Sequence, residues 1–234
     1  MNKTDNSNNL LEIYDAIEHD GFSLGTLQLI NKLTNDIEKG RANFSRFNEQ
    51  EHAGLCKAGE ALIGASIIAG YARRSLTAGG NATDSQRDRP ANWEIDERQE
   101  QLIEQWAKAA GLWFDKSEQF LQNRFGPMIA QGAESKVYYT DGFDSVAKER
   151  CSIYSTTEKA LQAIVLHNTL FPETEMNVFA FTRDTDTLFR IVLTQPYVRC
   201  LRLATKDEIA PKSERAWGEL HNKKRLSGLD NLFW

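Results

Sequence analysis

The sequence predicts an α+β protein, in which a helical front part is followed by a small antiparallel sheet with one helix packed on it. Apolar residues recur at helical spacing between residues 10 and 74, which is typical of amphipathic helices. From Ile129 to Val198, β-branched and aromatic runs alternate with glycine turns, as expected for short strands. Inside that region, the stretch from Thr156 to Leu166 has helical periodicity.

The front part is expected to hold helices over Leu10–Glu18, Leu24–Lys39 and Asn48–Arg74. Glycine follows soon after each of the first two, and glycine favours the end of a helix. The third stretch is rich in Ala, Ile and Gly, which predicts close packing against other helices. It could equally break at Gly59.

A polar stretch with several glycines, from Ser75 to Asn92, divides the chain. Helices are expected after it over Trp93–Trp113 and Lys116–Arg124. A capping-box pattern, with Thr205 followed by Glu208, predicts a helical tail. The predicted organisation is a helical amino-terminal module, a polar linker, an α+β domain and a helical tail, over residues 1–75, 76–92, 93–204 and 205–234.

The first predicted strands lie on either side of Gly132, where a turn can need a positive φ or a close approach of the backbone to a ligand. Asp141-Gly142 is a strong hairpin signal between strand-like runs. Val146–Lys148 follows as a short strand, and the ammonium group of a lysine there can reach phosphate oxygens.

The helix predicted from Thr156 carries Glu158 in its first turn and ends at Phe171-Pro172. Two further strands then lead to an extended exit at Gln195–Val198. The region therefore combines a glycine turn, a lysine on a strand and a glutamate on the following helix.

Several segments of this region together indicate a known family: Gln131–Tyr138, Val146–Lys148, Leu166–Thr174, Phe179–Arg183 and Val192–Val198. They resemble the amino-terminal lobe of a protein kinase, and most closely the kinase-like domain of polyvalent proteins in bacterial phages and conjugative elements. The His-Asn-x-Leu-Phe-Pro-Glu-Thr and Gln-Pro-aromatic pieces are more specific than the glycine turn. The similarity covers roughly the second half of the chain.

The resemblance implies an ATP and magnesium site formed by Gly132, Val137, Lys148, Glu158, Gln195 and Tyr197. In that interpretation Gly132 opens a loop over the phosphates, and Val137 covers the base. Lys148 pairs with phosphate oxygens and with Glu158. Gln195 and Tyr197 belong to a hinge whose backbone groups bind the adenine edge.

The sequence departs from the kinase pattern in ways that argue against catalysis. The turn has one glycine where many kinases have three, and the connection between Lys148 and Glu158 is short. Residues 198–234 contain no His-Arg-Asp-type catalytic loop and no Asp-Phe-Gly. The catalytic base and the magnesium ligands that phosphoryl transfer needs are therefore not found.

Composition and sequence patterns argue against several other classes of protein. A net charge of −5 argues against a nucleic-acid binder driven by overall charge. Cys56, Cys151 and Cys200 are far apart, which indicates reduced thiols rather than a metal site. The amino terminus lacks a secretory signal, and no apolar segment approaches the ~20 residues of a membrane span. These features predict a cytoplasmic protein.

Three functions remain open at this point. The favoured one is a kinase-like protein of a mobile element that lacks the catalytic lobe, binds nucleotide weakly and is not an active kinase alone. The second is half of a phosphotransferase that a partner or a missing continuation completes. The third is a structural or interaction protein, which binds a protein partner or a second copy through the exposed lobe face.

Overall fold

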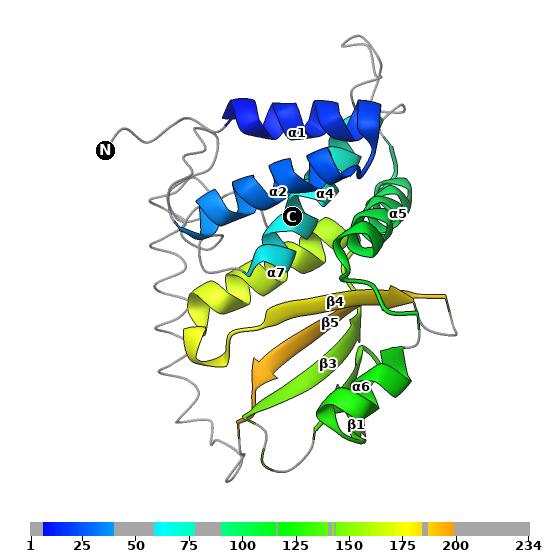
Figure 1. The fold of residues 1–234 in the computed structure, drawn as a ribbon. Helices are drawn as coiled ribbons and strands as arrows, with labels where there is room; N and C mark the ends of the chain where they lie inside the picture. Colours follow the sequence, from blue (N-terminus) through cyan, green and yellow to red (C-terminus); the bar gives the residue numbers. More distant parts are fainter. Residues whose placement is uncertain are drawn as a thin grey trace, which may run out of the picture.

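The computed structural model describes residues 7–39, 59–77, 90–115, 117–139, 142, 144–183 and 187–198, which form helices around a five-stranded sheet (Figure 1). The predicted α+β class is confirmed. The predicted helical tail, most of the predicted linker and the start of the third predicted helix lie outside the described residues.

The front part contains α1 (Ser7–Asp20), α2 (Leu24–Glu38) and α4 (Glu60–Thr77). Gly21 has a φ of 59° and turns the chain between α1 and α2. The hydroxyl of Ser23 caps α2 by accepting a hydrogen bond from the Thr26 amide at 3.3 Å. None of the described helices is long and apolar enough to span a membrane.

Two helices follow, α5 (Asn92–Ala110) and α6 (Ser117–Phe125). The helix predicted to reach Trp113 ends earlier, because Gly111 adopts a left-handed φ of 73° and turns the chain. Trp113 instead forms an isolated bridge with Phe181 in the sheet.

The sheet consists of β1 (Met128–Gln131), β2 (Ser135–Tyr138), β3 (Ser145–Cys151), β4 (Asn177–Arg183) and β5 (Phe189–Pro196). Their order is β1-β2-β3-β5-β4, and all neighbours are antiparallel. Between β3 and β4 lie α7 (Thr157–Leu170) and the short 3-10 helix η2 (Pro172–Thr174). This arrangement is consistent with the predicted kinase amino-lobe-like unit.

The segment after α5 pairs with the outer edge of β4. The Phe181 amide donates to the Leu112 carbonyl at 2.8 Å, and the Phe114 amide donates to the Phe181 carbonyl at 3.2 Å. These bonds satisfy backbone groups that an edge strand would otherwise expose.

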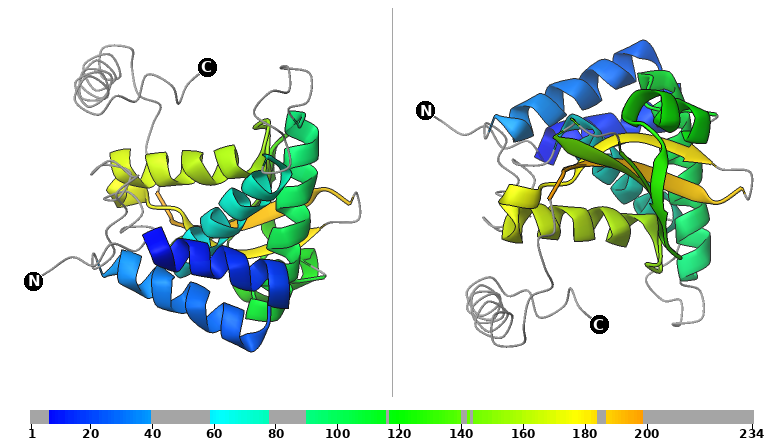
Figure 2. Two further views of the ribbon diagram at one scale, coloured as in Figure 1. Left: turned by 90° about the horizontal axis from the view of Figure 1, so that it is seen from above. Right: turned by 90° about the horizontal axis from the view of Figure 1, so that it is seen from below.

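Helices cover both faces of the sheet (Figure 2). Alternate residues of a strand point to opposite faces, so Ala147 of β3 lies with Leu121 of α6 in a core cluster on one side. On the other side, Ile164 of α7 packs with Ile191 and Leu193 of β5. The predicted packed helix is α7, and α6, which corresponds to the helix expected over Lys116–Arg124, packs on the opposite face.

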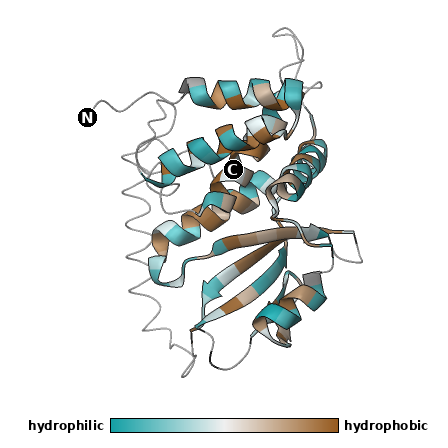
Figure 3. Cartoon of the chain, in the orientation of Figure 1, coloured by the Kyte–Doolittle hydropathy of each residue, from teal (hydrophilic) through white to brown (hydrophobic). Residues whose placement is uncertain are grey.

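One hydrophobic core joins the front helices to the sheet. It runs from Ile13 of α1 and Ile68 of α4, through Ile103 of α5, to Leu193 of β5. Figure 3 shows apolar segments where α4 and α7 lie in the middle of the helical layer. Helices from before and after residues 76–92 therefore contribute to this core.

Candidate functional site

The structure places Val137, Lys148 and Gln195 on one face of the sheet, the face toward α7. Lys148 lies directly opposite Val137 on β2 and opposite Leu193 on β5. Directly opposite residues of antiparallel strands share a face, and Gln195 shares the face of Leu193 because strand side chains alternate. Three of the predicted nucleotide-site residues are thus brought together.

Lys148 is half-buried, and a neutral group holds its ammonium. Its Nζ donates a hydrogen bond to Oε1 of Gln195 at 2.6 Å. The amide of Gln195 in turn donates to the Thr174 carbonyl at 3.0 Å, which fixes its orientation. Burial lowers the pKa of Lys148, and the nearby charge of Arg150 lowers it further.

Glu158 is held by α4 and α5 and is not paired with Lys148. Its Oε1 lies 3.1 Å from Nη2 of Arg73 on α4. Gln99 of α5 donates to Oε2 of Glu158 at 3.3 Å and accepts from the Glu158 amide at 3.0 Å. Asp96 of α5 accepts from the backbone amide and the hydroxyl of Thr157, which ties down the first turn of α7.

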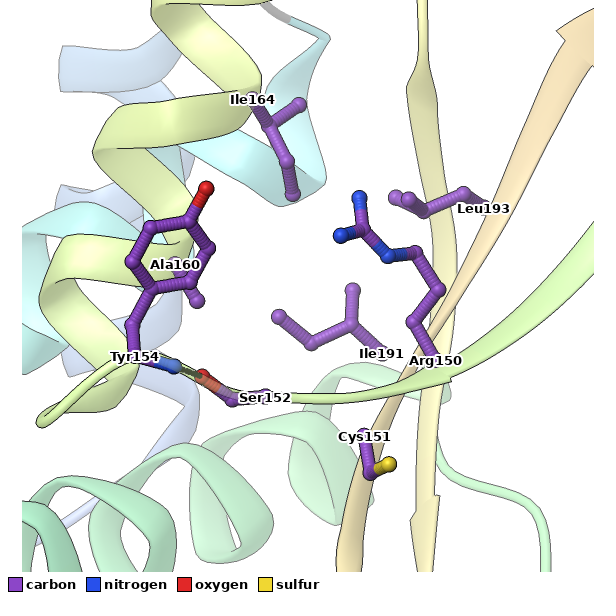
Figure 4. Close-up of a pocket in the computed structure, with 8 residues that line it drawn as sticks. All are labelled: Arg150, Cys151, Ser152, Tyr154, Ala160, Ile164, Ile191 and Leu193. Carbon is purple, nitrogen blue, oxygen red and sulfur yellow. Dashed lines mark hydrogen bonds between the residues drawn. The ribbon is translucent and has the colours of Figure 1, made fainter. Parts of the chain in front are cut away.

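The predicted convergence of Lys148 and Glu158 is therefore wrong, although both residues are described. The reason is the rotation of α7 about its axis. Ala160 and Ile164 point toward the sheet (Figure 4). Glu158 lies two residues before Ala160, about 200° around the helix, and so points away from the sheet.

A double-mutant cycle can measure whether Glu158 interacts with Arg73 or with Lys148. We expect a coupling of about 0.5 kcal/mol between Arg73 and Glu158, because the arginine is largely exposed and such pairs are weak. We expect no measurable coupling between Lys148 and Glu158. Urea unfolding of the single and double alanine variants gives both values. A stronger coupling for the Lys148 pair than for the Arg73 pair would contradict the structure.

Gly132 and Tyr197 lie outside this cluster of side chains. The Gly132 amide donates to the Ser135 carbonyl at 2.8 Å and so closes the turn between β1 and β2. Its φ is not positive, and an added Cβ would meet only that carbonyl oxygen, at 4.0 Å. The turn itself therefore does not need glycine.

Tyr197, in the predicted hinge, makes contacts within the fold. Its amide donates to the Asp144 carbonyl at 2.7 Å. Its ring stacks on that of Tyr139, with the centroids 4.2 Å apart. The amide of Tyr197 would have to leave this bond to bind an adenine edge. The part of Tyr197 and Gly132 in nucleotide binding stays a prediction.

Sequence reasoning missed Arg150, which lies with Lys148 on the inner face of the sheet, the face toward α7. The signal was present, because residues two apart on a strand point to the same side. It also missed Asp96 and Gln99, since no local pattern shows which distant helix will meet α7. Within the described ranges, no group of three or more His, Cys, Asp or Glu side chains is placed to hold a metal ion.

Comparison with known proteins adds one finding. Residues 96–212, half of the chain, match the family model described as serine/threonine/tyrosine kinase found in polyvalent proteins. The matched region includes most of α5, α7 and every strand of the sheet. No curated protein and no solved structure matches the chain. The chain belongs to the kinase family found in polyvalent proteins.

Proposed function

We propose that this chain is a kinase-like protein of a mobile element that binds ATP with magnesium weakly on the inner face of its sheet and does not transfer phosphate alone. The observation that carries the proposal is the half-buried ammonium of Lys148, placed beside Val137 and held by the neutral amide of Gln195. A lysine on that strand, facing the helix, is the arrangement in which kinases contact nucleotide phosphates.

The chemistry of the site favours binding over catalysis. No acidic side chain of the described residues pairs with Lys148, so its charge is available to a phosphate oxygen. Phosphoryl transfer also requires a base and acidic magnesium ligands. Residues 198–234 carry neither of the kinase motifs that supply them. We therefore expect the chain to bind the phosphates of ATP without transferring one of them.

Thermal unfolding with ATP and magnesium tests the proposal. Ligand at ten times its Kd stabilises the folded state by about 1.4 kcal/mol, which raises the melting temperature by several degrees. We expect this shift in the wild type and its loss in Lys148→Ala. Lys159→Ala, which removes an exposed lysine of α7, is the matched control and should keep the shift.

The ligand-dependent shift is the readout, because Lys148→Ala also removes the hydrogen bond to Gln195 and changes the starting stability. An equal ATP shift in Lys148→Ala and in the control would contradict a nucleotide site at Lys148. Phosphate transfer to a peptide or protein substrate by the purified chain would contradict the second half of the proposal.

A second candidate function is that of an interaction protein. It is favoured by two consecutive apolar side chains that remain exposed directly after β5, with Tyr197 42% and Val198 64% exposed. Contiguous exposed apolar groups often mark interfaces. A concentration-dependent dimer in light scattering, abolished by Val198→Asp, together with no ATP shift, would favour this function over nucleotide binding.

A further inference from the structure

A small pocket lies between the end of β3, α7 and β5 (Figure 4). Its polar lining consists of Arg150, Cys151, Ser152 and Tyr154, and its apolar lining of Ala160, Ile164, Ile191 and Leu193. Figure 4 shows the guanidinium of Arg150 directed into the space between Ile164 and Leu193. A cation therefore points into a largely apolar space under α7.

Arg150 has few partners for its charge. Its side chain is 28% exposed, and its ion pair within the described residues joins Nη2 to Oε2 of Glu134 at 3.7 Å, too far for a hydrogen bond. A guanidinium has five N–H donors, and none of them donates a hydrogen bond to another described residue. Leaving a partly buried charge without hydrogen bonds is costly, so the arrangement favours a ligand that accepts them.

The surroundings of Arg150 are cationic. Lys148 lies two residues earlier on the same face of β3, and its partner Gln195 is neutral. The two positive charges act on each other, which contributes to the lowered pKa of Lys148. An anion near both groups would relieve this repulsion.

The size and the hydroxyl groups of the pocket indicate which anion fits. The cavity volume is about 20 Å³, which is room for one or two water molecules, so the pocket admits an oxygen of a small anion but not a whole nucleotide. The hydroxyl oxygen of Ser152 accepts from the Tyr154 amide at 3.1 Å, which leaves its hydrogen free to donate (Figure 4). Arginine forks and hydroxyls are the usual partners of phosphate oxygens.

We propose that this pocket binds one phosphate group, with Arg150 as its cation and the hydroxyls of Ser152 and Tyr154 at its rim. The phosphate is the terminal group of the nucleotide, an assignment that rests on the proposed function, or it comes from a separate phosphate ester. Lys148 would then lie on the path between this phosphate and the rest of a bound nucleotide.

Binding of inorganic phosphate and of ATP, titrated separately by calorimetry at constant ionic strength, tests the pocket. We expect phosphate to bind the wild type and its Kd to rise roughly tenfold in Arg150→Gln, which loses charged hydrogen bonds. Arg150→Lys keeps the charge but loses the fork, and an intermediate Kd is expected. Arg124→Gln, on the exposed side of α6, is the matched control and should bind as the wild type does.

The outcomes separate this inference from the proposed function. Equal phosphate affinity in Arg150→Gln, Arg150→Lys and the control would overturn the pocket. ATP binding that needs Lys148 but not Arg150, without phosphate binding, would also overturn it and leave the nucleotide site standing. Phosphate binding that needs Arg150, without any binding of ATP, would support the pocket for a separate phosphate ester and overturn the nucleotide site.

Discussion

Replacing Phe181 by alanine is expected to lower the free energy of unfolding by about 3–5 kcal/mol. Phe181 is fully buried in the core that the front helices share with the sheet. Its ring centroid lies 6.1 Å from that of Trp106 on α5 and 5.9 Å from that of Phe189 on β5. Removal of the ring leaves a cavity between the two layers. Urea unfolding followed by circular dichroism measures the loss.

The same experiment tests whether the shared core makes the protein cooperative. We expect one unfolding transition for the wild type and for Phe181→Ala, because helices and sheet bury apolar surface against each other. Leu24→Ala is the control: Leu24 is 73% exposed, and its replacement should change stability by less than about 0.5 kcal/mol. Separate transitions for the helical part and the sheet would argue against a common core.

Gly64→Val is expected to destabilise the protein by about 3 kcal/mol. An ideal Cβ at Gly64 of α4 would lie 2.5 Å from Cζ2 of Trp106, closer than real Cβ atoms come. The indole of Trp106 is buried, with 3% exposed, and cannot move aside without disturbing the core. Measurement of the melting temperature and the urea midpoint gives the size of the effect.

Gly25→Val is the matched control for that substitution. Gly25 also lies in a helix, α2, but the nearest atom to its added Cβ is Oγ of Ser23 at 3.8 Å. Since Val is a better helix former than Gly, we expect a change of less than about 0.5 kcal/mol in either direction. Equal losses for the two substitutions would show that contact with Trp106 does not decide the effect.

Local patterns in the sequence were sufficient to predict most elements of the fold. The helical spacing around Ala160 and Ile164 predicts α7, and the Pro after Phe171 predicts where it ends. The alternation of strands and turns predicts the sheet between Ile129 and Val198. It also predicts the strand on which Lys148 lies, because these signals depend on neighbours a few residues apart.

The direction in which α7 presents its residues could not be predicted in this way. It depends on Asp96 and Gln99, which bond the first turn of α7 from a helix about sixty residues earlier. The spacing between Lys148 and Glu158 carries no information about those contacts. The polar stretch after α4 likewise predicts a connection to the next helix. It does not predict that α4 packs on α5 and α7.

The pairing of residues 112–114 with β4 makes the two ends of the sheet unequal. That segment covers the outer edge of β4 at Phe181, whereas β1 at the other end pairs only with β2 among the strands of the described chain. All four residues of β1 are exposed, and Ile129 is 53% exposed. The β1 border is therefore the more open of the two, and a strand donated by another molecule would align there with less obstruction.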